Sequence, residues 1–207
     1  MDSIRFEQLW NRNQKTGSSN VAAAVFARLE KHYAEPHRHY HTAAHIEHCL
    51  CQVDLISVEY ADRDAVELAI WFHDVIYEIG DPANEENSAK WFMQVSLGEL
   101  KDNIRAQVNR LIMVTQHNLQ PENEDEKYMV DIDLSGFGMP WPEFSADSLR
   151  VRQEFPEVSD GVFENKHRMF LEMLASRDFF FCTILFRDMY ESQAKHNVRE
   201  KLLRLNG

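Results

Sequence analysis

Residues 69–77 read Ala69-Ile70-Trp71-Phe72-His73-Asp74-Val75-Ile76-Tyr77, one of the most apolar stretches of the chain. A segment of this composition belongs inside the fold, yet it carries a histidine and an aspartate side by side. Burying a carboxylate without a partner costs on the order of several kcal/mol, so a positive charge must compensate it. A bound cation is the most economical candidate, and the pair therefore predicts a metal site.

The periodicity of the surrounding sequence is helical. Apolar residues recur at intervals of three and four along nearly the whole chain, which has only 7 Gly and 6 Pro. No convincing alternating strand pattern occurs. We expect an all-α fold with helices near residues 3–13, 19–34, 42–59, 63–78, 84–97, 101–117, 124–135, 145–154, 160–175 and 178–204. Residues 136–142, with two glycines and two prolines, are the strongest predicted loop.

Several predicted helix starts carry a residue that can cap the first turn. Ser19, Thr42, Asp62 and Asn84 can each accept a hydrogen bond from a free amide there. Residues 85–86 are both glutamates, which suit the positive end of a helix dipole.

Length and charge limit the classes of protein. With 207 residues and 44% hydrophobic content, the chain is expected to form a single domain over residues 1–207. A net charge of −12 and an isoelectric point near 5.2 argue against a protein that grips duplex nucleic acid through its phosphates. We expect a small substrate instead.

The N-terminus and the cysteines predict the compartment. The N-terminus has no apolar signal-peptide core, and no stretch reaches the roughly 18 apolar residues of a membrane span. The spacing of Cys49 and Cys51 on a helix suits neither a disulfide nor a shared metal. These features predict a cytoplasmic protein with no membrane partner.

Three segments compete to complete the site around His73 and Asp74. Residues 38–48 hold four of the ten histidines, of which His41 and His45 are one helical turn apart. Residues 129–135 place Asp131 and Asp133 within another apolar run. The third segment, 112–117, is an apolar helix that ends in a histidine.

The order histidine, histidine-aspartate, aspartate on separate helices resembles the HD-domain metal-dependent phosphohydrolases. The similarity extends to one poorly characterised bacterial branch through Tyr40-His41-x-x-x-His45, Trp71-Phe72-His73-Asp74-Val75-Ile76-Tyr77, Asn84-Glu85-Glu86-x-Ser88-Ala89 and Asp131-x-Asp133-Leu134-Ser135-x-x-Gly138. It is clearest over residues 33–138.

This resemblance implies an HD-type helical bundle with a metal-site core at about 33–138 and C-terminal helices over 141–205 packing on it. It implies four metal ligands, with Asp131 as the alternative to the last: His45, His73, Asp74 and Asp133. Dinuclear members of the superfamily usually carry a further histidine where this chain has Asn84. The departure favours one metal ion, although His117 could still support a second.

The chemistry of this ligand set is consistent with a divalent ion. Two neutral imidazoles and two carboxylates bring a charge of about −2, which leaves a nearly neutral site that can be buried. Mn²⁺, Fe²⁺, Co²⁺, Ni²⁺ and Zn²⁺ suit these ligands, and Mg²⁺ suits them less well. An octahedral ion would keep two open positions, for a phosphoryl oxygen and an activated water.

Other residues are candidates for catalysis and substrate binding. For the general base we consider Glu85, Glu86 and Glu78, which lie just after the His-Asp pair. For phosphate binding we consider Arg38, His39 and Lys90, with His41 and His117 as further substrate-side residues. His41 has a structural alternative, which is an outer-shell hydrogen bond beside the metal site. His117 has another, because the helix dipole alone can explain a histidine at a helix C-terminus. The histidines at 32, 37, 167 and 196 are expected at the surface.

The sequence therefore predicts a hydrolase of a small phosphorylated molecule, such as a nucleotide, with monoester or diester undecided. The alternative is a catalytically silent sensor or interaction module that binds a metal or nucleotide on the same scaffold. A closed structural zinc site is a third reading. The aromatic segment 179–186 is expected to form core or a subunit interface, which would allow a homodimer.

Overall fold

Helices and the loops between them make up the part of the chain that the computed structural model describes, residues 1–56, 62–118 and 120–205, and these residues contain no strand. The helices are α1 (Ser3–Arg12), α2 (Ala22–Tyr33), α3 (Ala43–Val53), α4 (Arg63–Phe72), α5 (Asn84–Val95), α6 (Asp102–Val114), α7 (Glu124–Asp133), α8 (Trp141–Gln153), α9 (Asp160–Ala175) and α10 (Ile184–Leu205), with a 3₁₀ helix η1 (Leu134–Gly138). The predicted all-α bundle is confirmed. The last residues of the helix predicted over 42–59 lie outside the described residues.

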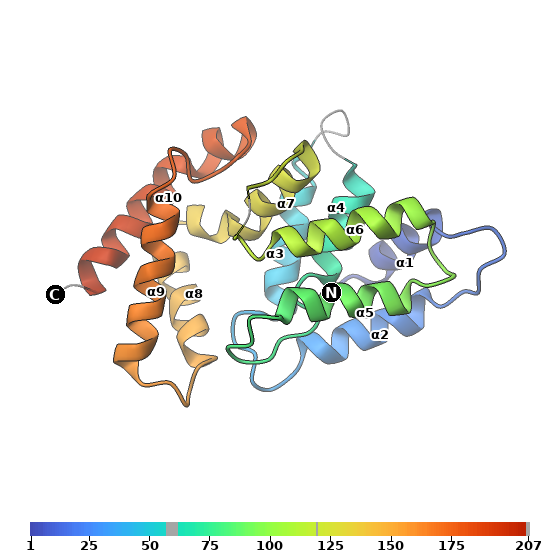
Figure 1. Cartoon of the computed structure of the whole chain (residues 1–207), viewed down its shortest axis with the longest axis horizontal. Coiled ribbons are helices and arrows are strands. Elements are labelled where there is room, and N and C mark those ends of the chain that lie inside the picture. Colours follow the sequence, from blue (N-terminus) through green and yellow to red (C-terminus); the bar gives the residue numbers. More distant parts are fainter. Residues whose placement is uncertain (57–61, 119, 206–207) are drawn as a thin grey trace.

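The helices form two groups at the two ends of the molecule, with α4 between the groups (Figure 1). Helices α8, α9 and α10 lie at one end of the molecule, and α1, α2, α5 and α6 lie at the other. Helix α4 lies between them and packs against α3, α6 and α7. The division into a metal-site core and C-terminal helices that pack on it stays a prediction.

The core beside α4 is aromatic. Phe6, Trp71 and Phe72 are fully buried, and the ring of Phe6 lies 5.4 Å from that of Trp71 and 6.1 Å from that of Phe72. Contacts of this kind hold α1 against α4 and fix the end of α4 in space. Every described helix is too short or too polar to cross a membrane.

Helix α4 ends at Phe72, six residues earlier than the sequence predicts. Arg38 provides a physical reason, because its guanidinium donates hydrogen bonds to the carbonyls of Asp74 at 2.6 Å and Val75 at 2.9 Å. Ser88 of α5 then bonds both the amide and the carbonyl of Ile76. These side chains replace the hydrogen bonds that a continuing helix would supply.

Two of the four predicted caps are confirmed and two are wrong. Thr42 accepts from the amide of Ala44, and Asp62 accepts from the amide of Ala65. Ser19 lies before the start of α2 and donates instead to Glu99. Asn84 is the first residue of α5, with its side chain bonded to the backbone of Glu78.

The predicted loop 136–142 is shorter than expected. Its first residues belong to η1, and α8 begins at Trp141 rather than near 145. Pro142 is compatible with this start because the first turn of a helix needs no amide there. Gly138 lies so close to α10 that a Cβ atom on it would collide with the Tyr190 side chain.

The aromatic segment 179–186 contributes mainly to the core. Phe180, Phe181 and Phe186 are buried, whereas half of Phe179 is exposed beneath the guanidinium of Arg187. Helix α10 begins at Ile184, after Phe179, Phe180 and Phe181, and not near 178. A homodimer stays a prediction.

Candidate metal centre

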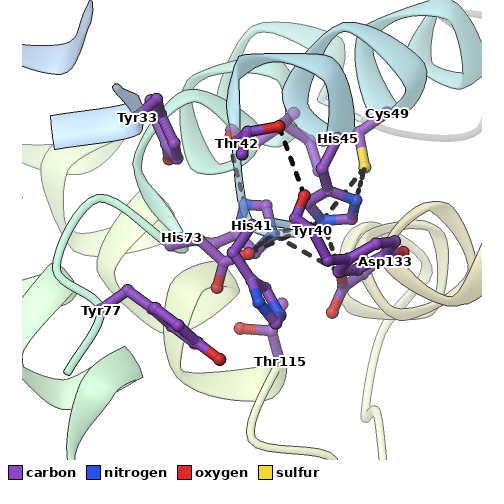
Figure 2. A network of polar contacts seen from close by, with 12 residues as sticks. Tyr33, Tyr40, His41, Thr42, His45, Cys49, His73, Tyr77, Thr115 and Asp133 are labelled. Atoms are coloured by element: carbon purple, nitrogen blue, oxygen red, sulfur yellow. Dashed lines mark hydrogen bonds and ion pairs between the residues drawn. The ribbon is translucent and has the colours of Figure 1, made fainter. Parts of the chain in front are cut away.

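Three separate segments bring histidine and aspartate side chains to one point (Figure 2). His45 lies on α3, His73 and Asp74 follow the last residue of α4, and Asp133 is the last residue of α7. His45, His73 and Asp74 form a group of side chains that could hold a metal ion. Asp133 lies against the two imidazoles of this group, at 3.3 Å from His45 Nε2 and 3.5 Å from His73 Nε2.

The spacing of the ligand atoms fits a single small cation. The two Nε2 atoms are 3.2 Å apart, and Asp74 Oδ2 lies 3.0 Å from His73 Nε2 and 3.6 Å from His45 Nε2. Ligand atoms about 2.1 Å from an ion lie about 3.0 Å apart at right angles and about 3.4 Å apart in a tetrahedron. The observed distances therefore match a shared ion without rearrangement of the backbone.

The ring of His73 is oriented by its own helix. Its Nδ1 lies 3.0 Å from the carbonyl of Ile70, which accepts a hydrogen bond and leaves Nε2 directed at the cluster. Such a bond to the second ring nitrogen is the usual way that proteins fix the tautomer of a metal-binding histidine. Both members of this covalently adjacent pair lie just beyond Phe72, the last residue of α4.

His117 supports Asp133 from the far side. Its Nε2 lies 2.9 Å from Asp133 Oδ2, while Asp133 Oδ1 faces the imidazoles of the cluster. His117 has a positive φ of 55°, a left-handed conformation that is uncommon outside glycine. Its side chain therefore contacts the site at some conformational cost, and its buried Nδ1 has no hydrogen-bond partner.

Electrostatics inside the cluster favour a positive charge. Burial opposes the imidazolium form of His73, but Asp74 and Asp133 outweigh this effect and hold its pKa well above the ordinary value. Burial likewise opposes ionisation of Asp133, yet contacts with His117, His45 and His73 hold its pKa well below the ordinary value. Two ionised carboxylates in a buried place require a proton or a cation beside them.

Asp131, the alternative to Asp133, has a different role. Its side chain is fully buried and accepts hydrogen bonds from the amides of Cys182 and Thr183 and from the Thr183 hydroxyl, each at 2.7 Å. Both of its carboxylate oxygens accept hydrogen bonds from the two residues that precede α10. The structure therefore places Asp133, and not Asp131, beside the histidines.

A pocket of about 280 Å³ opens beside the cluster. Its lining includes Asp74, Asp133, His41, His117 and Glu85. The carboxylate of Glu85 is half-buried, and burial raises its pKa. Of the three predicted bases, it is the one that lines this pocket.

The other two candidate bases point elsewhere. Glu86 is 52% exposed and forms an ion pair with Lys90 one turn along α5. Glu78 is exposed, with its backbone bonded to Asn84. Neither lines the pocket.

The predicted phosphate-binding cations are not brought to the pocket either. Arg38 is buried and bonds backbone carbonyls and Glu35, so its guanidinium serves the chain itself. Lys90 stays with Glu86 at the surface. His39 is exposed and borders a neighbouring depression. A role for these three in binding a phosphate group has no support from their positions.

Glu154, at the end of α8, is a functional candidate that the sequence reasoning missed. It is fully buried; Oε1 accepts hydrogen bonds from the amides of residues 39–41, and Oε2 contacts His41 Nδ1 at 2.7 Å and the Tyr77 hydroxyl at 2.8 Å. The ring of His41 stacks on Tyr77 with centroids 4.3 Å apart (Figure 2). This set of contacts orients His41 beside the pocket.

No local pattern marks Glu154 as special, because it is one of many acids on amphipathic helices and its partners lie more than 70 residues away. His167 is a second surprise: expected at the surface, it lines the pocket with a buried Nε2 that has no partner. Burial lowers its pKa to about 4.

Comparison with known proteins adds no relative. Family models, curated proteins and solved structures were each searched, and none matches this chain. What stands is an all-helical protein with a His-His-Asp group that could hold a metal ion, which is compatible with an HD domain.

Proposed function

We propose that this chain is an HD-type, metal-dependent phosphohydrolase that acts on a small phosphorylated molecule. The observation that carries the proposal is the convergence of His45, His73 and Asp74 from two helices at the side of a pocket. Asp133 from a third helix is the proposed fourth ligand, because its Oδ1 lies against both imidazoles.

The ligand set suits one divalent ion, Mn²⁺, Fe²⁺, Co²⁺, Ni²⁺ or Zn²⁺ in preference to Mg²⁺. Such an ion would polarise a phosphoryl oxygen and acidify a water molecule. The side chains of Asp74 and Asp133 are 12% and 15% exposed, so the cluster is open on the side of the pocket. An open face of this kind favours a catalytic over a closed structural site.

Three further side chains have roles in the proposed reaction. Glu85 takes a proton from water, a task that its raised pKa suits because a general base works best near the ambient pH. His41, held by Glu154, hydrogen-bonds the substrate at the pocket wall. His117 fixes Asp133 so that Oδ1 stays turned toward the histidines.

The test is hydrolysis by the purified, metal-analysed protein of a panel of nucleotides and aryl phosphate mono- and diesters. Turnover should disappear with a chelator and return with one of the five metals. Glu85→Gln should lower kcat by about 100-fold, in the range for loss of a general base. Glu86→Gln, the adjacent substitution at an exposed residue, should hydrolyse at the wild-type rate. Equal rates for wild type and Glu85→Gln would remove Glu85 from the mechanism.

The alternative, a sensor that binds without turnover, predicts a different result from the same panel. Tight binding of a nucleotide with no hydrolysis under any divalent ion would support it and would overturn the hydrolase proposal.

A further inference from the structure

The pocket beside the metal cluster has two chemically different walls. The polar wall comes from the segments that carry the cluster and from α5, and it includes Asp74, Asp133 and Glu85. The other wall comes from η1, α8, the turn after α8 and α9, and it is mostly aromatic: Phe137, Phe144, Val151, Phe155 and Phe170. Phe137 touches both Phe144 and Phe170, with ring centroids 5.5 and 6.3 Å apart. A substrate that fills this pocket must present an apolar surface opposite its phosphate.

The charge of the pocket limits the phosphate group itself. Four of the described lining residues are acids, Asp74, Glu85, Asp133 and Asp147, and none of the described lining residues is lysine or arginine. A divalent ion would offset the charge of two of these carboxylates. Arg150 pairs with Asp147 but does not line this pocket. A chain of phosphates would therefore meet these carboxylates with no lysine or arginine of the described lining to receive its extra charge.

The volume of the pocket also favours a substrate with a single phosphate group. The cavity volume of about 280 Å³ lies at the small end of ligand pockets, which typically measure about 300 to 1,000 Å³. A cavity of this volume has room for one phosphate group beside the cluster and a modest organic group against the rings.

Building on the proposed function, we propose that the substrate is an ester with a single phosphate group on an apolar, ring-containing organic group, and that polyphosphate esters are rejected. In the reaction, the oxygen of water bonds to phosphorus and the phosphorus–oxygen bond to the organic group breaks. The organic group leaves as an alcohol with one proton, and the phosphate product keeps the other.

The first test compares substrates in matched pairs with the metal-loaded, full-length protein. Phenyl phosphate and glycerol phosphate differ in the organic group, and adenosine mono- and triphosphate differ in the number of phosphates. We expect phenyl phosphate to exceed glycerol phosphate in kcat/KM by about 10-fold or more, the factor that burial of a ring provides. The monophosphate should exceed the triphosphate by a similar factor. A ratio of one or less in either pair overturns the corresponding part of the inference.

A pair of variants on α8 tests the charge argument. Asp147→Asn removes an acid from the pocket lining, and Glu143→Gln removes an exposed acid from the same helix that does not line it. The first should raise kcat/KM for the triphosphate relative to the monophosphate several-fold, and the second should leave that ratio unchanged. Equal ratios in the two variants would contradict the proposed role of Asp147.

Binding of phosphonates separates this inference from the proposed function, because phosphonates contain no ester bond to cleave. Calorimetric titration of the metal-loaded protein should show phenylphosphonate binding about 10-fold or more tightly than methylphosphonate. If that preference is found but no ester is hydrolysed, the hydrolase proposal fails and the pocket inference stands. If esters are hydrolysed but the two phosphonates bind equally, the pocket inference fails alone. If neither phosphonate binds and no ester is cleaved, both fail.

Discussion

Asp131 and Asp133 lie two residues apart on α7, and their side chains contact different parts of the fold. Asp133 turns Oδ1 toward the imidazoles of the candidate metal centre and Oδ2 toward His117. Asp131 turns away from the site and accepts hydrogen bonds from the start of α10. A step of two residues on a helix changes direction by about 200°, which separates the two carboxylates.

The first prediction concerns this pair. Asp133→Asn should weaken Mn²⁺ binding by about 100-fold, because an amide supplies no negative charge to the cation. Asp131→Asn should bind Mn²⁺ with nearly wild-type affinity, since its oxygens are not directed at the site. Calorimetric titration of both variants measures this, and wild-type affinity in Asp133→Asn would exclude that residue as a ligand.

The second prediction concerns the pH dependence of stability and Glu154. Burial raises the pKa of this carboxyl, but the bonds from His41 and the backbone amides outweigh it and lower the pKa from 4.5 to about 2. A carboxyl with a depressed pKa stabilises the fold above its unfolded value, and that stabilisation is lost as the pH falls from 4.5 through about 2. The contribution is on the order of 3 kcal/mol.

Denaturant unfolding should therefore show that the wild type has a higher free energy of unfolding than Glu154→Gln above pH 4.5. This difference should shrink as the pH falls from 4.5 through about 2. Glu143→Gln, an exposed acid on the same helix, should follow the wild-type profile. If the free energies of unfolding of Glu154→Gln and wild type stay parallel across the window, the contact with His41 does not stabilise the fold.

At the residue scale, the sequence allowed part of the site to be predicted. His73 and Asp74 stand out because two ionisable residues interrupt an apolar run, and the structure places them together with His45. Glu154 could not be found in this way, since its importance comes from contacts with residues far away in the sequence. Arg38 was predicted to bind phosphate, but a free arginine and one that caps a helix end look alike in sequence.

At the scale of elements, the start of α10 depends on two carboxylates from elsewhere in the chain. Asp131 accepts from the amides of Cys182 and Thr183, and Glu191 accepts from those of Phe180 and Phe181. These amides precede or begin a helix and have no intrahelical acceptor, so the carboxylates satisfy them.

The third prediction follows from these bonds. Asp131→Ala should lower the free energy of unfolding by on the order of 3 kcal/mol, because it leaves buried amides without an acceptor. Amide hydrogen exchange should rise most in residues 180–187, where α10 begins. Glu124→Ala, at an exposed position at the start of the same helix α7, is the control for a general effect on that helix. Unchanged exchange in residues 180–187 would contradict the assigned role.

The helices themselves were largely predictable, because each buries one apolar face and the spacing of apolar residues in the sequence indicates that face. The errors fall at ends where a distant side chain decides the outcome. Helix α4 ends early because Arg38 captures two carbonyls, and α10 starts late because its preceding amides bond Asp131 and Glu191. Local propensity carries no information about such partners.

At the scale of the whole molecule, the proposed metal ion joins α3, the end of α4 and α7. An ion bound only by the folded state stabilises it by about 2.7 kcal/mol at 100 times its dissociation constant. For a chain of this length, that corresponds to an increase in melting temperature of about 5 to 10 °C.

The fourth prediction is that Mn²⁺ produces this increase in the wild type and not in His45→Ala. His39→Ala, which removes an exposed histidine from the preceding loop, should retain the increase. Scanning calorimetry with and without the ion measures the shift. An equal shift in His45→Ala would place the stabilising ion elsewhere.

The most direct test of the central claim is an anomalous difference map from crystals of the Mn²⁺-loaded protein. We predict a peak about 2.0 to 2.3 Å from Nε2 of His45, Nε2 of His73 and a carboxylate oxygen of each of Asp74 and Asp133, with coordination positions left open toward the pocket. A peak bound elsewhere, or no peak near these four residues, would contradict the metal centre and with it the proposed hydrolase.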